Sequence, residues 1–139
     1  MIDHFNLKRF VSAQNPAYEQ VISELQRGRK AGHWMWFVFP QISGLGVSWM
    51  SQKYAISSRA EAEAYLAHPI LGTRLIECTR LVISVDRSSI QEIFGYIDSL
   101  KFRSSMTLFG EVANDPAIFQ AALRKYFEGH PDQLTLDRI

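Results

Sequence analysis

Three short segments of the chain combine residues whose side chains could bind or process a charged ligand. The first is RGRKAGHW at residues 27–34, which places three cations and a histidine beside two glycines. Flexible glycine backbone next to Arg and Lys is suited to cradling a phosphate, so Arg27 and Lys30 are candidate phosphate ligands. A second interpretation stays open, because cations also stabilise the negative C-terminal end of a preceding helix.

The second segment is the aromatic run HWMWFVFPQ at residues 33–41. An indole ring can stack on a nucleobase or a nicotinamide, which makes Trp34 and Trp36 candidate ligand-binding residues. Large aromatic side chains more often belong to the core, and that is the alternative interpretation. His33 and Gln41 bracket the run. Histidine is the side chain best suited to proton transfer under physiological conditions, so His33 could act as an acid or a base. A buried Gln41 would need hydrogen-bond partners that a ligand could supply.

The third segment is DSLKFRSSMTLF at residues 98–109. On a helix, Asp98, Lys101 and Ser105 fall at positions i, i+3 and i+7 and share one face, which predicts a polar row. In that row Asp98 could orient a water molecule and Lys101 could stabilise developing negative charge. Arg103 points elsewhere and could reach a second anion. The alternative is an acidic residue in the first turn of a helix with a surface lysine nearby.

Other well-known ligand patterns do not occur. Gly44 and Gly46 form a lone glycine pair without a preceding strand or a third glycine, so a dinucleotide fingerprint is not supported. The four histidines are scattered and Cys78 is the single cysteine, so we expect no metal site, no disulfide and no bound cofactor.

Composition limits the class of protein. The chain has 139 residues, 47% of them hydrophobic and 21% charged, which predicts one globular domain over residues 1–139. With 15 basic and 14 acidic residues the net charge is +1, which argues against a nucleic-acid partner. The longest apolar run is too short to span a bilayer, and the N-terminus lacks the layout of a signal peptide. We therefore expect a cytoplasmic protein that does not associate with membranes and binds, if anything, a small molecule. Whether it has a protein partner is left open.

Helical spacing and capping patterns dominate the chain. Asn15-Pro16 predicts a helix start, Gly28 a helix stop, and Ser58 and Ser89 each open a sequence typical of a capping box. Residues 34–57 have no clean period, which favours irregular backbone with short helices or a small β element. The expected fold is all-α, a compact non-repetitive bundle of roughly six to eight helices.

The same segments resemble a known family, the bacterial and fungal domain of unknown function numbered 1810, whose members often carry the label calpastatin. The strings that carry the resemblance are HWMWFVFPQ, GLG at 44–46, YAI at 54–56, YLAHP at 65–69, LGTRL at 71–75 and DSLKFRSSMTLF. The resemblance implies an all-α fold and no established activity. Calpain inhibitors of that name are disordered, whereas this composition is globular. Tyr54 and Ser104, which lie in these strings, join Ser105 as candidate ligand-binding residues.

A second resemblance, to the mainly helical family that includes swarming-motility and riboflavin-pathway N-glycosidases, rests on a charged helix with Lys after Asp, followed by Met. It implies NAD-derived or ADP-ribosyl ligands. One hypothesis is therefore a protein that binds or hydrolyses a phosphorylated nucleotide-like molecule at an N-glycosidic bond, with His33, Asp98 and Lys101 as catalytic candidates. The alternative is a non-catalytic protein–protein interaction module that uses the aromatic strip at residues 34–49. Enzymatic activity is left undecided.

Overall fold

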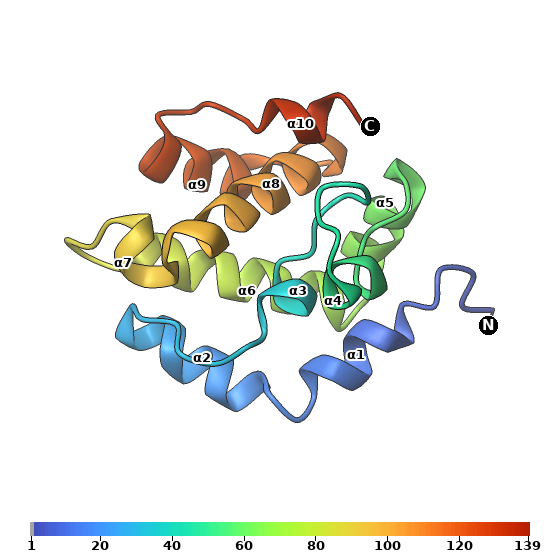
Figure 1. Ribbon diagram of the computed structural model, residues 1–139, viewed down its shortest axis with the longest axis horizontal. Coiled ribbons are helices and arrows are strands. Elements are labelled where there is room, and N and C mark those ends of the chain that lie inside the picture. Colours follow the sequence, from blue (N-terminus) through green and yellow to red (C-terminus); the bar gives the residue numbers. More distant parts are fainter. Residues whose placement is uncertain (1) are drawn as a thin grey trace.

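Helices and their connections make up the whole computed structural model, which describes residues 2–139 (Figure 1). Over these residues there is no strand, so the all-α prediction is confirmed. The helices are α1 Lys8–Gln14, α2 Tyr18–Arg27, α3 Met35–Val38, α4 Trp49–Lys53, α5 Arg59–Ala67, α6 Leu71–Ser84, α7 Ile90–Phe94, α8 Tyr96–Val112, α9 Ala117–Phe127 and α10 Gln133–Leu136.

The expected number of helices was slightly low, since ten are found over the described residues. Four of them, α3, α4, α7 and α10, have only four or five residues. Such a helix completes little more than one turn, so its residues cannot repeat at helical spacing often enough to reveal a period.

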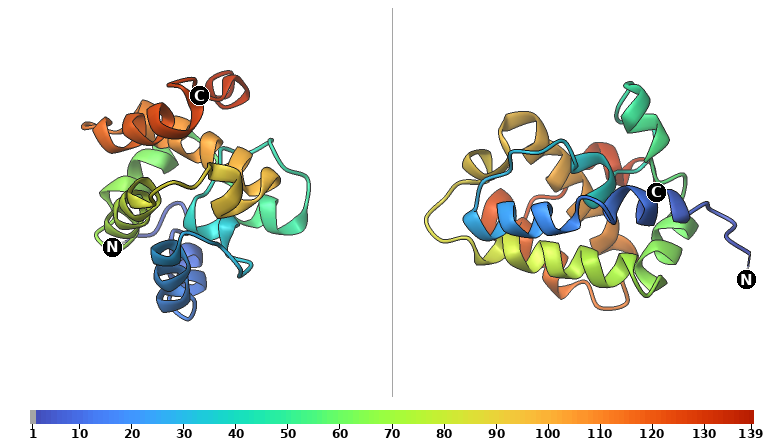
Figure 2. Two further views of the ribbon diagram at one scale, coloured as in Figure 1. Left: turned by 90° about the vertical axis from the view of Figure 1, so that its left-hand side faces the viewer. Right: turned by 90° about the horizontal axis from the view of Figure 1, so that it is seen from below.

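Helix α8 occupies the middle of the fold, where it contacts α5, α7, α9 and α10 (Figures 1 and 2). Its buried residues lie on all sides, as expected of a helix surrounded by others. Aromatic side chains fill the space around it. The rings of Phe39 and Phe102 meet edge to face with centroids 5.0 Å apart, and Phe94 packs against both. Segment 34–39 is therefore attached to α8 by ring packing.

Several helix ends follow the sequence signals. Gly28 ends α2 with a φ of 74°, and Ser89 forms a complete capping box with Glu92. Ser58 Oγ accepts a hydrogen bond from the Glu61 N–H at the start of α5. The predicted start at Asn15-Pro16 is wrong, because α2 begins at Tyr18. Asn15 keeps helical backbone angles that continue α1, and its side chain accepts a hydrogen bond from Arg74.

Residues 34–57 form the irregular region that the sequence predicted, built from α3, α4 and the chain between them. Its β element is a single bridge between Ile42 and Ile56. The Ile56 N–H donates to the Gln41 carbonyl and the Ser43 N–H donates to the Ile56 carbonyl, each at 2.8 Å. This bridge turns the loop after α3 back onto α4 and so creates the hollow described below.

The loop end at residue 56 is held by an ion pair between α1 and α5. Arg9 Nη2 lies 2.8 Å from Glu61 Oε2, and the same guanidinium donates to the carbonyls of Lys53 and Ala55. The other oxygen of Glu61 accepts from the backbone and hydroxyl of Ser57. Arg9 therefore ties three segments together that are far apart in the sequence.

Candidate functional site

A cluster of three charged side chains lies at the start of α8. Lys30 Nζ is 2.8 Å from Asp98 Oδ2, and Lys101 Nζ is 3.7 Å from Asp98 Oδ1. The side chains are only 10%, 20% and 19% exposed for Lys30, Lys101 and Asp98 respectively. The Lys30 N–H also donates to the Ile93 carbonyl at the end of α7, which fixes the loop beside α8. Two of the segments identified in the sequence therefore meet here.

The loop that carries Lys30 is anchored by the buried carboxylate of Glu24 on α2. Glu24 Oε1 accepts from the N–H groups of Ala31 and Gly32 and from the indole Nε1 of Trp34, at 2.7 to 2.9 Å, and Oε2 accepts from Gln20. Burial by itself would raise the pKa of Glu24, but these hydrogen bonds outweigh it and lower the pKa to about 2. The loop is thus folded around a permanent negative charge.

Trp34 and Trp36 take different positions. Trp34 is fully buried and its indole N–H is used by Glu24, so its ring faces the core. Lys30 Nζ lies 5.3 Å from its ring centroid. Trp36 is partly exposed, and Lys101 Nζ lies 5.1 Å from its ring centroid. Of the two indoles, Trp36 is the one with a surface that a ligand can reach.

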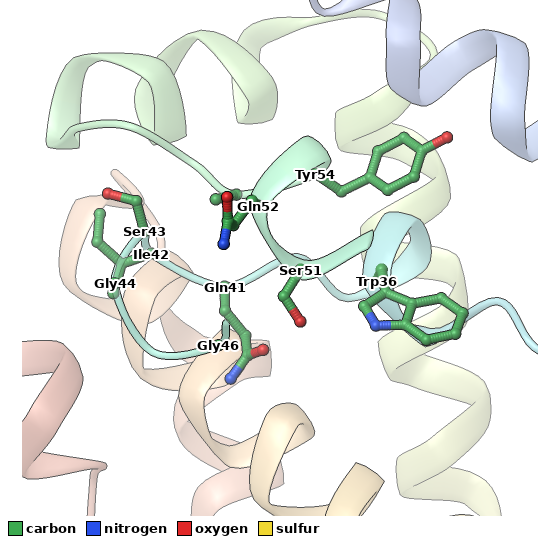
Figure 3. A pocket seen from close by; sticks show the side chains of 10 residues that line it. Trp36, Gln41, Ile42, Ser43, Gly44, Gly46, Ser51, Gln52 and Tyr54 are labelled. Atoms are coloured by element: carbon green, nitrogen blue, oxygen red, sulfur yellow. The ribbon is translucent and has the colours of Figure 1, made fainter. Parts of the chain in front are cut away.

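Trp36 also lines a hollow of about 130 Å³ between the loop after α3 and α4 (Figure 3). The rest of its lining is mostly polar or glycine: Gln41, Ile42, Ser43, Gly44, Gly46, Ser51, Gln52, Tyr54 and Ala55. Among residues 2–139 no hydrogen-bond partner is found for the side chains of Gln41 and Ser43. The hollow therefore offers an amide and a hydroxyl that are available to a ligand.

Gly44 and Gly46 both line this hollow. Their spacing does not match a dinucleotide-binding motif, and the structure gives them another role. A Cβ at Gly46 would lie 2.6 Å from the hydroxyl oxygen of Ser51, so only glycine fits beside α4. Gly44 has a φ of 94°, in the region that favours glycine. The glycines serve the tight course of the loop, a role that their spacing did not reveal.

The predicted polar row on α8 divides in two. Asp98 and Lys101 belong to the charged cluster, whereas Ser105 is fully buried and its hydroxyl has no hydrogen-bond partner in the described part of the chain. Ser104 binds the C-terminal segment instead, donating to Asp132 at 3.0 Å. Arg103 also turns that way, donating to the carbonyls of His130 and Pro131.

The other predicted residues lie at the edge of the cluster or outside it. His33 and Arg27 are exposed, and no hydrogen bond or ion pair of their side chains is found over residues 2–139. Tyr54 is buried at the wall of the hollow, where its ring packs against those of Phe10 and Phe37. The structure thus brings together Lys30, Trp36, Asp98 and Lys101, with Gln41 and Tyr54 in the adjoining hollow.

Residues 2–139 contain neither a cluster of metal-ligating side chains nor a helix able to span a membrane. No group of three or more His, Cys, Asp or Glu side chains is placed to hold a metal ion. No helix in that range has both the length and the apolar character needed to cross a membrane.

Comparison with known proteins places the chain in a family. The sequence profile of DUF1810, described as a protein of unknown function, matches residues 4–139. The chain belongs to the DUF1810 family. This member is 55% identical to the conserved hypothetical protein Rv1873 from Mycobacterium tuberculosis, whose crystal structure superposes with a TM-score of 0.96. The alignment covers 97% of this chain and 96% of that one. Among curated proteins there is no match to this DUF1810 member.

Proposed function

We propose that this protein binds a phosphorylated, nucleotide-like small molecule of the NAD or ADP-ribose type. The observation that carries the proposal is the largely buried cluster of Lys30, Asp98 and Lys101, which adjoins the hollow through Trp36. Two ammonium groups around one carboxylate leave one positive charge. Because these groups are largely shielded from water, that charge attracts a phosphate more strongly than exposed lysines do.

The size of the hollow limits what it can enclose. Sites that enclose a drug-sized ligand usually measure about 300–1,000 Å³, whereas this one measures about 130 Å³. A single sugar or small ring fits such a space, with Trp36 available for stacking and Gln41 for hydrogen bonding. The phosphates of the ligand then extend over Trp36 toward Lys101 and Lys30.

Hydrolysis of an N-glycosidic bond is the enzymatic form of the proposal. Asp98 would orient the attacking water, and His33 would accept the proton that this water loses as its oxygen bonds to C1′. The C1′–N bond would break with nicotinamide leaving NAD as a neutral base, while Lys101 would stabilise the negative charge of the neighbouring phosphate. Both oxygens of Asp98 face a lysine in the unliganded protein, so a phosphate that draws the lysines away would free the carboxylate. Release of nicotinamide from NAD, followed by chromatography, tests this form directly.

Binding is tested by replacing Lys101 with Met. We expect the affinity for ADP-ribose, measured by isothermal titration calorimetry, to fall about tenfold because one phosphate contact is lost. The free energy of unfolding should change by less than about 1 kcal/mol, since Asp98 keeps its closer partner Lys30. Lys8→Met, an exposed lysine on α1, is the matched control and should leave the affinity unchanged. Failure of ADP-ribose, NAD and AMP to bind at millimolar concentration would rule the proposal out.

An interaction module remains a second candidate function because one end of the aromatic strip is exposed. Trp34, Phe37 and Phe39 are buried, but Trp49 is 70% exposed and Val47 is 90% exposed. Lys53 Nζ lies 4.9 Å from the Trp49 ring centroid. An apolar partner surface could cover this edge.

For the second candidate, Trp49→Ala should abolish co-purification of a stable partner while leaving thermal stability unchanged, since the side chain is outside the core. Tyr96→Ala is the matched control, because Tyr96 is an aromatic residue of α8 that is 69% exposed. Equal recovery of the partner with both variants would contradict a role for the strip.

A further inference from the structure

An arginine near the C-terminal end of the chain lies beside Gly44, one of the residues that line the hollow, although nothing in the sequence connected the two. Arg138 follows α10, and its N–H donates to the Thr135 carbonyl. Its guanidinium rests on Gly44, where a Cβ would lie 2.8 Å from the Arg138 Cζ. A side chain at this position would push the guanidinium aside, and Gly44 is itself part of the lining of the hollow.

The guanidinium of Arg138 makes no hydrogen bond or ion pair with the other described residues. No acceptor for it is found within residues 2–139, either as a hydrogen bond or as an ion pair, and the residue is exposed. A guanidinium presents five N–H donors in a planar fork that matches a phosphate or carboxylate. By contrast, the guanidinium groups of Arg9 and Arg103 donate hydrogen bonds to backbone carbonyls.

The groups beside Arg138 are also donors. Gly44 and Gly46 have backbone N–H groups for which no acceptor is found over the described residues, and the hydroxyl of Ser43 is likewise unpaired. Backbone N–H groups that have no acceptor within a loop are available to donate to an anion. No acidic residue lines this hollow, and Arg138 brings a positive charge to the end at Gly44.

The two ends of the hollow therefore resemble each other. Figure 3 shows Gly44 and Trp36 on opposite sides, with Gln41 and Ser51 between them. Lys101 lies over Trp36 at one end, and Arg138 lies against Gly44 at the other. A ligand that satisfies both ends has an anionic group on each side of the part that the hollow encloses.

We propose that Arg138 and the loop of residues 43–46 form a second anion subsite, so that the ligand is a nucleotide-like molecule with two separated anionic groups. This inference rests on the proposed function, and it specifies the substrate class further. One anionic group meets Lys101 and Lys30, and the other meets Arg138. The enclosed part is then a sugar with phosphate on both sides, as in the 2′-phosphorylated adenosine of NADP and unlike the riboses of NAD and ADP-ribose.

The test compares adenosine 3′,5′-bisphosphate with AMP by isothermal titration calorimetry, since the pair differs by one phosphate. We expect the bisphosphate to bind about tenfold more tightly to the unmodified protein, as one added charge-assisted contact implies. Arg138→Gln should remove this preference and leave the affinity for AMP unchanged. Arg124→Gln, an exposed arginine on α9, is the control with the same change of charge and should keep the preference.

The outcomes separate the two proposals. Equal affinity for both nucleotides in the unmodified protein, or a preference that persists in Arg138→Gln, overturns the second subsite while binding itself stands. Absence of binding by AMP, the bisphosphate and ADP-ribose removes the proposed function and the subsite with it. A urea titration of Arg138→Gln should match the unmodified protein, because the side chain is exposed. A large loss of stability would show that Arg138 serves to hold the loop, and that result also overturns the subsite.

Discussion

Replacing Arg9 with Met is expected to lower the free energy of unfolding by about 3–5 kcal/mol. The Arg9 side chain is 15% exposed and that of Glu61 is 3% exposed. Without Arg9 the Glu61 carboxylate stays buried with only the two hydrogen bonds from Ser57, and an uncompensated buried charge is costly. The carbonyls of Lys53 and Ala55 lose their donor as well. Urea unfolding followed by far-UV circular dichroism measures the loss.

The control for Arg9 is the ion pair between Arg59 and Glu63, which also belongs to α5. These side chains are 53% and 55% exposed and lie 3.4 Å apart. Arg59→Met should change the free energy of unfolding by less than about 1 kcal/mol, as expected of an exposed pair. Similar small losses in both variants would show that the Arg9 network contributes little. The double replacement of Arg9 and Glu61 with Met and Leu should recover part of the stability, because no buried charge is then left alone.

The fold was largely predictable because several helix ends carry local signals. Gly28 and Ser89 act within a few residues of themselves, so their roles follow from backbone sterics and capping. Asn15 shows the limit of such signals. Its side chain is engaged by Arg74 of α6, a contact between distant segments that only the folded chain reveals. The short helix α3 is likewise fixed by packing, since Met35, Phe37 and Val38 are buried. Helix α4 has no buried residue and is instead capped locally by Ser48, whose hydroxyl accepts from the Ser51 N–H.

The site was predictable in part for the same reason. Asp98 and Lys101 are three residues apart on a helix, so their pairing follows from helix geometry. Lys30 joins them only because the loop after α2 packs against the start of α8. The sequence showed the clustered cations of that loop but not where the loop packs. Trp34 and Trp36 are two residues apart and could not be told apart, although one is core and the other lines the hollow. Arg138 carried no local signal, since its partner Gly44 is distant in the sequence.

Replacing Glu24 with Gln is the second change for which we expect a large effect. The glutamine keeps the size of the side chain, and its amide oxygen can still accept from Ala31, Gly32 and Trp34, but that oxygen carries no charge. Its NH2 group replaces the oxygen that accepts from the Gln20 amide, so two donors then face each other. At neutral pH we expect the free energy of unfolding to fall by about 2–4 kcal/mol, since strong hydrogen bonds to a buried charge are lost. The loop that positions Lys30 should loosen too, so binding of ADP-ribose should weaken along with stability.

The pH dependence of the free energy of unfolding shows whether Glu24 acts through its negative charge or only through packing. The folded pKa of Glu24 is about 2, below the value of 4.5 for an unperturbed glutamate. A depressed pKa contributes stability that is fully present above about pH 4.5 and is lost as the pH falls toward 2, because the unfolded chain takes up the proton first. Urea titrations between these pH values should therefore show a smaller slope for Glu24→Gln than for the unmodified protein. Glu19→Gln, an exposed residue of the same helix, should keep the full slope. If all three proteins lose stability in parallel on acidification, Glu24 is not the charge that holds the loop.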